Sequence, residues 1–141
     1  MGEDDPLAAE KSFRRSYDSL PEIFAFVEAF FDSRGIDRGH LASVDLIVEE
    51  LFTNMVKYCP GNTHEILIGL ERSGRRIAVS LTDFDVDPFD INDAPEPDVD
   101  RPITERKPGG LGLHIVKRMV ERIDYEYADR KSKTTVIKAL E

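Results

Sequence analysis

Apolar residues recur every three to four positions over two long stretches in the first half of the chain, which is the spacing of amphipathic helices. The first stretch covers 20–31, and Ser19 together with Glu22 predicts a capping box at its start. Gly35 predicts the end of this helix, since glycine adopts the left-handed conformation of a C-cap without strain. The second stretch predicts a helix over 37–58.

A third helical row follows a glycine-rich turn in the second half of the chain. We expect this helix to begin at the turn formed by 109–112. Its expected core-facing row consists of Leu111, Ile115, Met119 and Ile123. The chain is therefore predicted to contain three helices.

Elsewhere the apolar spacing changes to every second residue, which is typical of strands. The predicted strands are 11–17, 66–70, 77–81, 125–128 and 134–140. A Ser-Gly turn at 73–74 joins two of them as a hairpin, and adjacent hairpins favour antiparallel pairing. We predict an α+β fold, a two-layer α/β sandwich with a mixed, mostly antiparallel sheet and the three helices on one face.

The segment 84–108 follows neither spacing, and it contains five of the eight prolines together with many acidic residues. A loop this long inside a compact domain is usually functional. We predict that it forms a lid within a single domain at 11–141, preceded by a flexible N-terminus at 1–10. Few apolar anchors and many like charges lead us to expect a lid that is mobile without a ligand.

Charge and composition exclude several classes of function. The 141 residues carry 19 basic and 28 acidic side chains, a net charge of −9, which disfavours binding to nucleic acid or an anionic membrane. No apolar run approaches a membrane span, and the first residues show no signal-peptide pattern. Cys59 is the single cysteine, so a disulfide framework is excluded and a reducing cytoplasm is the expected location.

The second predicted helix carries a polar stripe away from its core face. On a helical wheel Asn54 lies about 40° from Glu50, and Lys57 lies about 20° to the other side. Leu46 and Ile47 flank this stripe, so it differs from an ordinary solvated face. A carboxylate beside a carboxamide on a rigid helix suits metal and proton chemistry. The alternative is a solvated acid with an asparagine near the helix end.

Two later features add candidate ligand-binding groups. Asp83 leaves the second strand of the hairpin, where a carboxylate can accept hydrogen bonds in a fixed geometry, although it could also be a solvated turn residue. The glycines of 109–112 let a phosphate approach a helix N-terminus, whose N–H groups and dipole favour anions. Lys107 precedes this turn and offers a cationic phosphate contact. Such a turn alone also marks ordinary helix starts.

The order and spacing of these features resemble the anti-sigma-factor serine kinases, a family with the Bergerat ATP-binding fold of histidine kinases. Glu50-Leu51-Phe52-Thr53-Asn54 resembles the E-x-x-T-N box of that family, and Asp83 falls where its adenine-binding aspartate belongs. Pro88-Phe89-Asp90 resembles its Pro-Phe-Asp segment, and the stretch 109–117 resembles its second glycine box. The resemblance covers roughly 12–140, essentially the whole domain.

The resemblance implies a role for each matching residue. Glu50 would be the general base that takes the proton from a substrate serine, and Asn54 would hold Mg²⁺ against the nucleotide phosphates. Asp83 would accept the adenine amino group. The nucleotide-binding residues that we expect are Asn54, Lys57, Asp83, Asp85, Phe89, Lys107, Gly109, Gly110, Leu111, Gly112 and Leu113, with ATP and Mg²⁺ as the bound groups.

This sequence departs from the family at the first glycine box. The family reads Asp-x-Gly there, with a phenylalanine five residues after the aspartate, whereas Phe89 here comes six residues after Asp83. Asp85 stands in place of the glycine and adds charge near an anionic ligand. An alternative alignment makes Asp85 the adenine-binding acid, but then Phe89 comes one residue too early.

The resemblance implies an ATP- and Mg²⁺-dependent protein serine kinase that phosphorylates an anti-anti-sigma (STAS-domain) partner. Such a protein would sequester a sigma factor or a similar regulator, would form a homodimer, and would contact neither nucleic acid nor membrane directly. A second hypothesis, motivated by Asp85, is a non-catalytic partner-binding module of the same fold with weakened or absent nucleotide binding. A third hypothesis is a stand-alone ATPase module of a phosphorelay.

Overall fold

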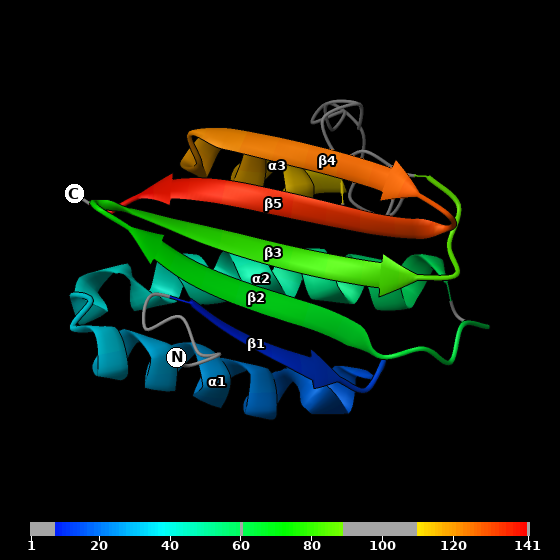
Figure 1. Cartoon of the computed structure of the whole chain (residues 1–141), viewed down its shortest axis with the longest axis horizontal. Helices are drawn as coiled ribbons and strands as arrows, with labels where there is room; N and C mark the ends of the chain where they lie inside the picture. The colour runs from blue at the N-terminus through cyan, green and yellow to red at the C-terminus, as the bar shows by residue number, and fades with distance from the viewer. Residues whose placement is uncertain (1–7, 60, 89–109, 141) are drawn as a thin grey trace, which may run out of the picture.

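The computed structural model describes residues 8–59, 61–88 and 110–140, which form one antiparallel sheet with helices packed on one of its faces (Figure 1). The strands are β1 (Ala8–Phe13), β2 (Ile66–Ser73), β3 (Arg76–Phe84), β4 (Arg122–Ala128) and β5 (Lys131–Ala139). The helices are α1 (Leu20–Arg34), α2 (Leu41–Tyr58) and α3 (Gly110–Met119), with short 3-10 turns at Tyr17–Ser19 and Arg38–His40.

The arrangement confirms the predicted α+β two-layer sandwich. The strands lie in the order β1-β2-β3-β5-β4, and each described pair is antiparallel. Helix α2 lies behind the middle of the sheet between α1 and α3, against both of which it packs (Figure 1). The central position of α2 leaves one flank of this helix facing the first turn of α3.

The core forms between the helices and the inner face of the sheet. Alternate residues of β3 point inward, so that Ile77, Val79 and Leu81 are fully buried between the strands and α2. Burial of one such side chain contributes roughly 1.5–3 kcal/mol to folding. The other fully buried large side chains are Phe31, Phe52, Ile23, Ile47, Ile66, Ile68, Leu70, Val27, Val44 and Val48.

The start of α1 differs from the predicted capping box. Ser19 precedes the helix but already has helical backbone angles, and its hydroxyl donates to the Arg14 carbonyl at 2.8 Å rather than capping. A 3-10 turn comes immediately before α1, and it is Ser16 that caps this turn by accepting from Asp18 N at 3.1 Å. The C-terminal prediction is confirmed, because Gly35 has a left-handed φ of 65° and its N–H bonds to the Phe31 carbonyl.

The predicted core row of α3 is wrong in two positions. Ile115 is 41% exposed, and Ile123 belongs to β4 rather than to the helix. The buried side chains of this helix are instead Leu113 and Val116, with Met119 packed against the core. The reason is that α3 ends at Met119 and is oriented by its close approach to α2, which is a tertiary contact.

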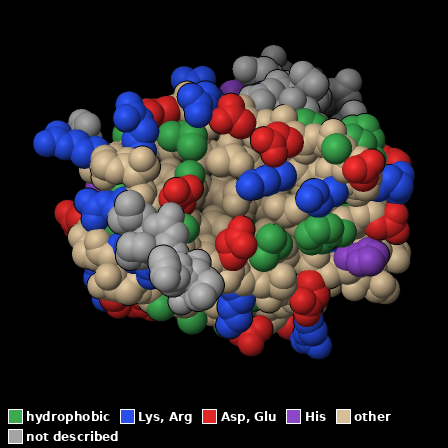
Figure 2. All heavy atoms as spheres, in the orientation of Figure 1, with side chains coloured by type: hydrophobic (Ala, Val, Ile, Leu, Met, Phe, Trp, Pro, Cys, Tyr) green, Lys and Arg blue, Asp and Glu red, His purple; other side chains and the backbone are tan. Residues whose placement is uncertain are grey.

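The outer face of the sheet has no helix over it in the described part of the chain. A hollow of about 400 Å³ lies there, over small residues such as Gly69, Ala78 and Ser80. Figure 2 shows this face, with charged side chains distributed around the hollow. Within the described residues, no helix is long and apolar enough to cross a membrane.

Candidate functional site

The side-chain amide of Asn54 is held in one orientation inside the molecule. Asn54 is only 6% exposed, and its Nδ2 donates to the Glu50 carbonyl one turn earlier at 2.6 Å. Because a carbonyl can only accept, this bond fixes Oδ1 on the opposite side of the amide. Oδ1 is buried and has no hydrogen-bond partner among the described residues, so the site holds an oxygen ligand that lacks a partner.

The Glu50 carboxylate lies beside this amide and is half-buried. Burial, and secondarily the charge of Glu49, raise the pKa of Glu50, while Lys57 acts in the opposite direction. A carboxyl group with a raised pKa is a better proton acceptor than an ordinary surface carboxylate. Lys57 itself is exposed, so it influences this side chain across solvent.

Gly112 brings the first turn of α3 directly against Glu50. A Cβ on Gly112 would lie 2.9 Å from the Glu50 Oε1 and still closer to its other carboxyl atoms, so a larger residue would displace the carboxylate. Gly110 is the first residue of α3, which puts the unpaired N–H groups of a helix N-terminus beside Glu50. Leu113, which was predicted to contact the nucleotide, is buried and packs this turn into the core.

Asp83 ends β3 with its side chain turned into the helix-covered side of the sheet. It is 3% exposed, and its Oδ1 accepts from the backbone N–H of Phe84 at 3.0 Å and from the Arg15 guanidinium. Burial raises the pKa of the Asp83 carboxyl, and Arg15 and the Phe84 N–H partly offset this. A buried carboxylate with fixed partners is a defined acceptor rather than a solvated turn residue.

Arg15 is a site residue that the sequence interpretation missed. It follows β1, and its side chain is 4% exposed beside Asp83. Besides Asp83, it donates to the carbonyls of Met55 at 2.8 Å and His64 at 3.3 Å. An arginine inside the strand predicted over 11–17 carries no local signal of this role, because its partners lie 40 to 68 residues away.

Two hydroxyl residues of β5 lie near Asp83 on the helix-covered face of the sheet, and the sequence analysis did not identify them either. Ser132 stands directly opposite Asp83 in the β3–β5 register, and it is 7% exposed. Thr134, two residues later on the same face, is 3% exposed. Both occupy inward positions of the alternating pattern, and polar residues at such positions were the signal that could have identified them.

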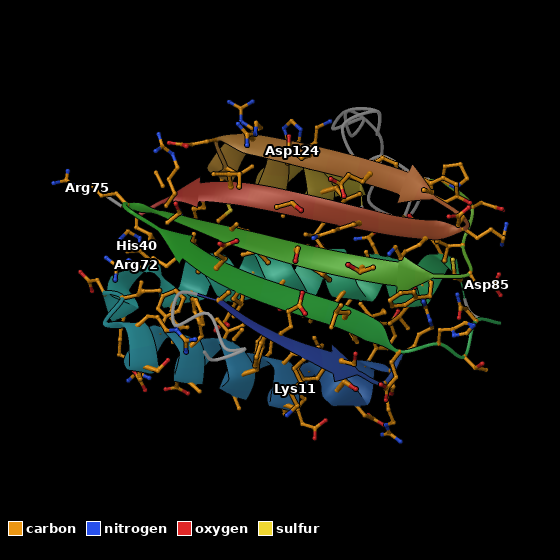
Figure 3. All side chains as sticks on the ribbon, viewed as in Figure 1. Lys11, His40, Arg72, Arg75, Asp85 and Asp124 are labelled. Atoms are coloured by element: carbon orange, nitrogen blue, oxygen red, sulfur yellow. The ribbon has the colours of Figure 1, made fainter. Side chains whose placement is uncertain are left out.

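Asp85 lies beyond the end of β3, at the edge of the molecule (Figure 3). Its φ is 60°, a conformation that glycine adopts most readily but that aspartate tolerates. Its carboxylate accepts from Arg130 Nε at 2.9 Å, and this contact lowers the pKa of Asp85. The charge that we expected near an anionic ligand is therefore compensated by Arg130 in the turn between β4 and β5.

The remaining predicted residues lie outside the part of the chain that is described. These are Phe89, Lys107 and Gly109, together with most of the predicted lid. Leu111 belongs to α3, but its side chain is not described. The structure therefore brings predicted residues together in two groups. Glu50, Asn54 and Gly112 lie where α2 meets the first turn of α3. Asp83 lies with Arg15 near the carboxyl ends of α2 and β3.

The donor set is compatible with a magnesium ion. Mg²⁺ prefers oxygen ligands and keeps several waters, so one amide oxygen and the phosphates of a nucleotide are sufficient. The unpartnered Oδ1 of Asn54 offers such a ligand in a buried position. The described residues contain no group of three or more histidine, cysteine or carboxylate side chains, which is the arrangement of an all-protein metal site.

An acid and an amide on one helix, a glycine-rich start of the next helix and a buried aspartate on the sheet define a nucleotide-binding class of α+β domain. The chain belongs to the family of histidine kinase-like ATPase domains, whose model matches residues 13–138. The sandwich described above is accordingly the Bergerat fold. This family membership confirms the resemblance noted from the sequence at the level of the domain.

Solved structures share this fold at low sequence identity. A chain in the crystal structure of the SiaB–SiaC complex from Pseudomonas aeruginosa superposes with a TM-score of 0.63 at 14% identity, covering 92% of this chain and 88% of that chain. The histidine kinase AdeS of Acinetobacter baumannii gives a TM-score of 0.49 at 17% identity, covering 94% of this chain and 68% of that chain. No curated protein matches the chain.

Proposed function

We propose that this chain is an ATP- and Mg²⁺-dependent protein serine kinase that acts as an anti-sigma regulatory factor and phosphorylates a STAS-domain partner. The observation that carries the proposal is the grouping of Glu50 and Asn54 with Gly112. A proton acceptor and an unpartnered metal ligand lie one turn apart, beside a helix N-terminus. In this proposal the ATPase-type fold binds the nucleotide, and the grouping of Glu50, Asn54 and Gly112 carries out the phosphoryl transfer.

In the proposed reaction the Glu50 carboxylate accepts the proton of the partner's serine hydroxyl. The hydroxyl oxygen then forms a bond to the γ-phosphorus of ATP while the bond to the ADP oxygen breaks. Glu50 suits this role because burial raises its pKa toward the working range of a general base. Mg²⁺, when bound, neutralises charge on the phosphates, and Asn54 Oδ1 is the residue atom that would hold it.

The N-terminus of α3 has the complementary role of receiving phosphate groups. Gly110 is the first residue of this helix, Gly112 lets the Glu50 carboxylate lie against its first turn, and the helix dipole favours negative charge there. Asp83 is proposed to accept the amino group of adenine from its buried position on β3. Lys57, Asp85, Phe89, Lys107, Gly109, Leu111 and Leu113 remain proposed nucleotide contacts around these groups.

The proposed partners are proteins rather than nucleic acids or membranes. One solved structure with this fold is a complex between two proteins, SiaB and SiaC. A net charge of −9 also suits a protein partner with basic patches better than an anionic polymer. We propose a STAS-domain substrate, a sigma factor or similar regulator as the alternate partner, a homodimeric state and a cytoplasmic location.

Incubation with labelled ATP, Mg²⁺ and each STAS-domain protein of the same genome tests the proposal. We expect phosphoserine on one of them with the wild-type chain, and a loss of at least about a hundredfold in rate with Glu50→Gln, which removes the base. Glu49→Gln, one residue away on the same helix, is the matched control and should retain the activity. No labelled STAS protein, or equal labelling by Glu50→Gln, would refute the kinase.

A second candidate is a partner-binding module that has lost effective nucleotide binding. The observation in its favour is Asp85 at the position of the family's glycine, with a φ of 60°. Titration with ATP in the presence and absence of Mg²⁺ separates the two functions. Tight binding by the wild-type chain supports the kinase, whereas binding that appears only after Asp85→Gly supports the non-catalytic module.

A further inference from the structure

The Asp83 carboxylate is not symmetric, because its two described hydrogen bonds fall on the same oxygen. Oδ1 accepts from the Phe84 N–H at 3.0 Å and from a guanidinium N–H of Arg15. A carboxylate oxygen offers about two lone-pair sites, so these two donors occupy Oδ1. Oδ2 is left as the acceptor that a bound molecule can use.

Arg15 cannot easily leave this position. Its side chain is 4% exposed, and its other nitrogens donate to the Met55 carbonyl at 2.8 Å and the His64 carbonyl at 3.3 Å. Met55 lies in the last turn of α2, where carbonyls lack helical partners, so Arg15 also caps this helix. A ligand that displaced Arg15 from Asp83 would have to break this whole set of contacts.

Adenine and guanine differ in the number of hydrogen bonds that they can donate to such a carboxylate. Adenine presents one exocyclic amino group on its pairing edge, which needs a single acceptor oxygen. Guanine presents two adjacent N–H donors, and a carboxylate recognises both only when each of its oxygens is available. An aspartate with one occupied oxygen therefore retains its bond to adenine but loses half of the bidentate bond to guanine.

We propose that Arg15 is a specificity-determining residue for the nucleobase, which restricts Asp83 to one base donor and so removes the advantage that a bidentate bond would give guanine over adenine. The inference rests on the proposed function, in which Asp83 is the acceptor for the base. It adds a residue on the β1–α1 connection that no motif of the sequence indicated. The loss of one hydrogen bond to a charged group corresponds to about tenfold or more in affinity.

The first experiment uses the wild-type chain alone. Dissociation constants for ATP, GTP and ITP are measured by calorimetry with Mg²⁺ under one set of conditions. ITP has the guanine-like ring N–H but lacks the 2-amino group, so it cannot make the bidentate contact. We expect GTP and ITP to bind within about twofold of each other, and ATP to bind at least as tightly as GTP, because each base makes a single bond to Oδ2.

The second experiment frees Oδ1 by Arg15→Met, with Arg14→Met as the matched control because Arg14 is exposed. We expect GTP to gain about tenfold relative to ITP in Arg15→Met, while Arg14→Met keeps the wild-type ratios. Arg15→Leu, which also lacks a donor, replaces Arg15→Met if the latter does not fold. An unchanged GTP-to-ITP ratio in the Arg15 variant, or a large preference for GTP over ITP in the wild type, would overturn the inference.

The binding measurements also distinguish a failure of this inference from a failure of the proposed kinase function. A wild-type chain that binds no nucleotide refutes the proposed kinase, and the inference with it. A chain that binds ATP with a base preference unaffected by Arg15→Met refutes only the role of Arg15.

Discussion

At the scale of single residues, Glu50 and Asn54 share one helix face but have different environments. The Asn54 amide is buried and fixed by its own backbone, whereas the Glu50 carboxylate reaches the first turn of α3. On these differences rests the proposal that Asn54 binds the metal and Glu50 accepts the proton. Substitution of Asn54 should therefore affect nucleotide binding, and substitution of Glu50 should affect phosphoryl transfer.

Asn54→Ala removes the unpartnered Oδ1 and should weaken binding of Mg-ATP by about tenfold or more, with little effect on ATP measured in EDTA. Calorimetric titration under both conditions checks this. Thr53→Ala, which removes a hydroxyl bonded to the Glu49 carbonyl at 2.8 Å, is the neighbouring control. Equal weakening of ATP binding with and without the metal would contradict a metal ligand.

Asp45 is a second titratable residue of α2 whose environment has a measurable consequence. Its Oδ1 is buried without a partner among the described residues, and burial with the nearby Glu49 raises the pKa of Asp45 to about 6. Because the folded pKa exceeds the unfolded value of 3.8, the protonated form is favoured by folding. Its stabilising effect is complete below pH 3.8 and is lost as the pH rises through about 6.

Asp45→Asn should accordingly raise the free energy of unfolding at pH 7.5 by about 1 kcal/mol, after a discount for partial exposure, and change it little near pH 4. Urea unfolding of both proteins across this range measures the difference. The control is Asp32→Asn, since that carboxylate is 61% exposed beside Arg38. A stability difference that does not vary with pH would disprove the burial of a charge at this position.

At the scale of elements, the decisive contact is between the middle of α2 and the first turn of α3. The two helices approach so closely at Gly112 that no side chain fits between its backbone and the Glu50 carboxylate. The same approach sets the rotation of α3, which buries Leu113 and Val116 and leaves Ile115 exposed. A substitution at Gly112 therefore tests both the packing and the proposed chemistry.

Gly112→Ala should lower the rate of phosphoryl transfer by at least about tenfold, because the new methyl group displaces the Glu50 carboxylate. It should lower the free energy of unfolding by less than about 1 kcal/mol, because the displaced carboxylate is the end of a flexible side chain. In a Glu50→Ala background the clash is absent, and alanine should instead stabilise the helix by roughly 0.5–1 kcal/mol. Equal destabilisation in both backgrounds would show that the methyl group clashes with something else.

At the scale of the whole molecule, the order of the sheet brings the site together. Strand β5 lies between β3 and β4, so Asp83 and Ser132 become neighbours although they are far apart in the sequence. The helix-covered face carries the buried polar residues Asp83, Ser132 and Thr134, whereas the hollow over Gly69 and Ser80 lies on the open face. The candidate site thus lies on the helix-covered side of the sheet, where partial burial strengthens hydrogen bonds.

Much of this arrangement was predictable because it depends on local spacing. The rows of α1 and α2 and the alternation in β2 and β3 gave the right elements, since burial of one face imposes these periods directly. The stripe of Glu50 and Asn54 was also visible, because residues four apart share a helix face. The boundaries of β1 and α3 were less accurate, since both depend on where neighbouring elements end.

The sequence by itself determined the fold class, the helix that carries Glu50 and Asn54, and the strand that carries Asp83. It could do so because these features follow from periodicity within a few turns of chain. Only the tertiary structure decided that Asn54 Oδ1 lacks a partner, that Arg15 occupies one oxygen of Asp83, and that Arg130 compensates Asp85. The contacts of Arg15 and Arg130 join residues 40 or more positions apart, and the burial of Asn54 Oδ1 without a partner among the described residues depends on the packing around it, so no local pattern contains these facts.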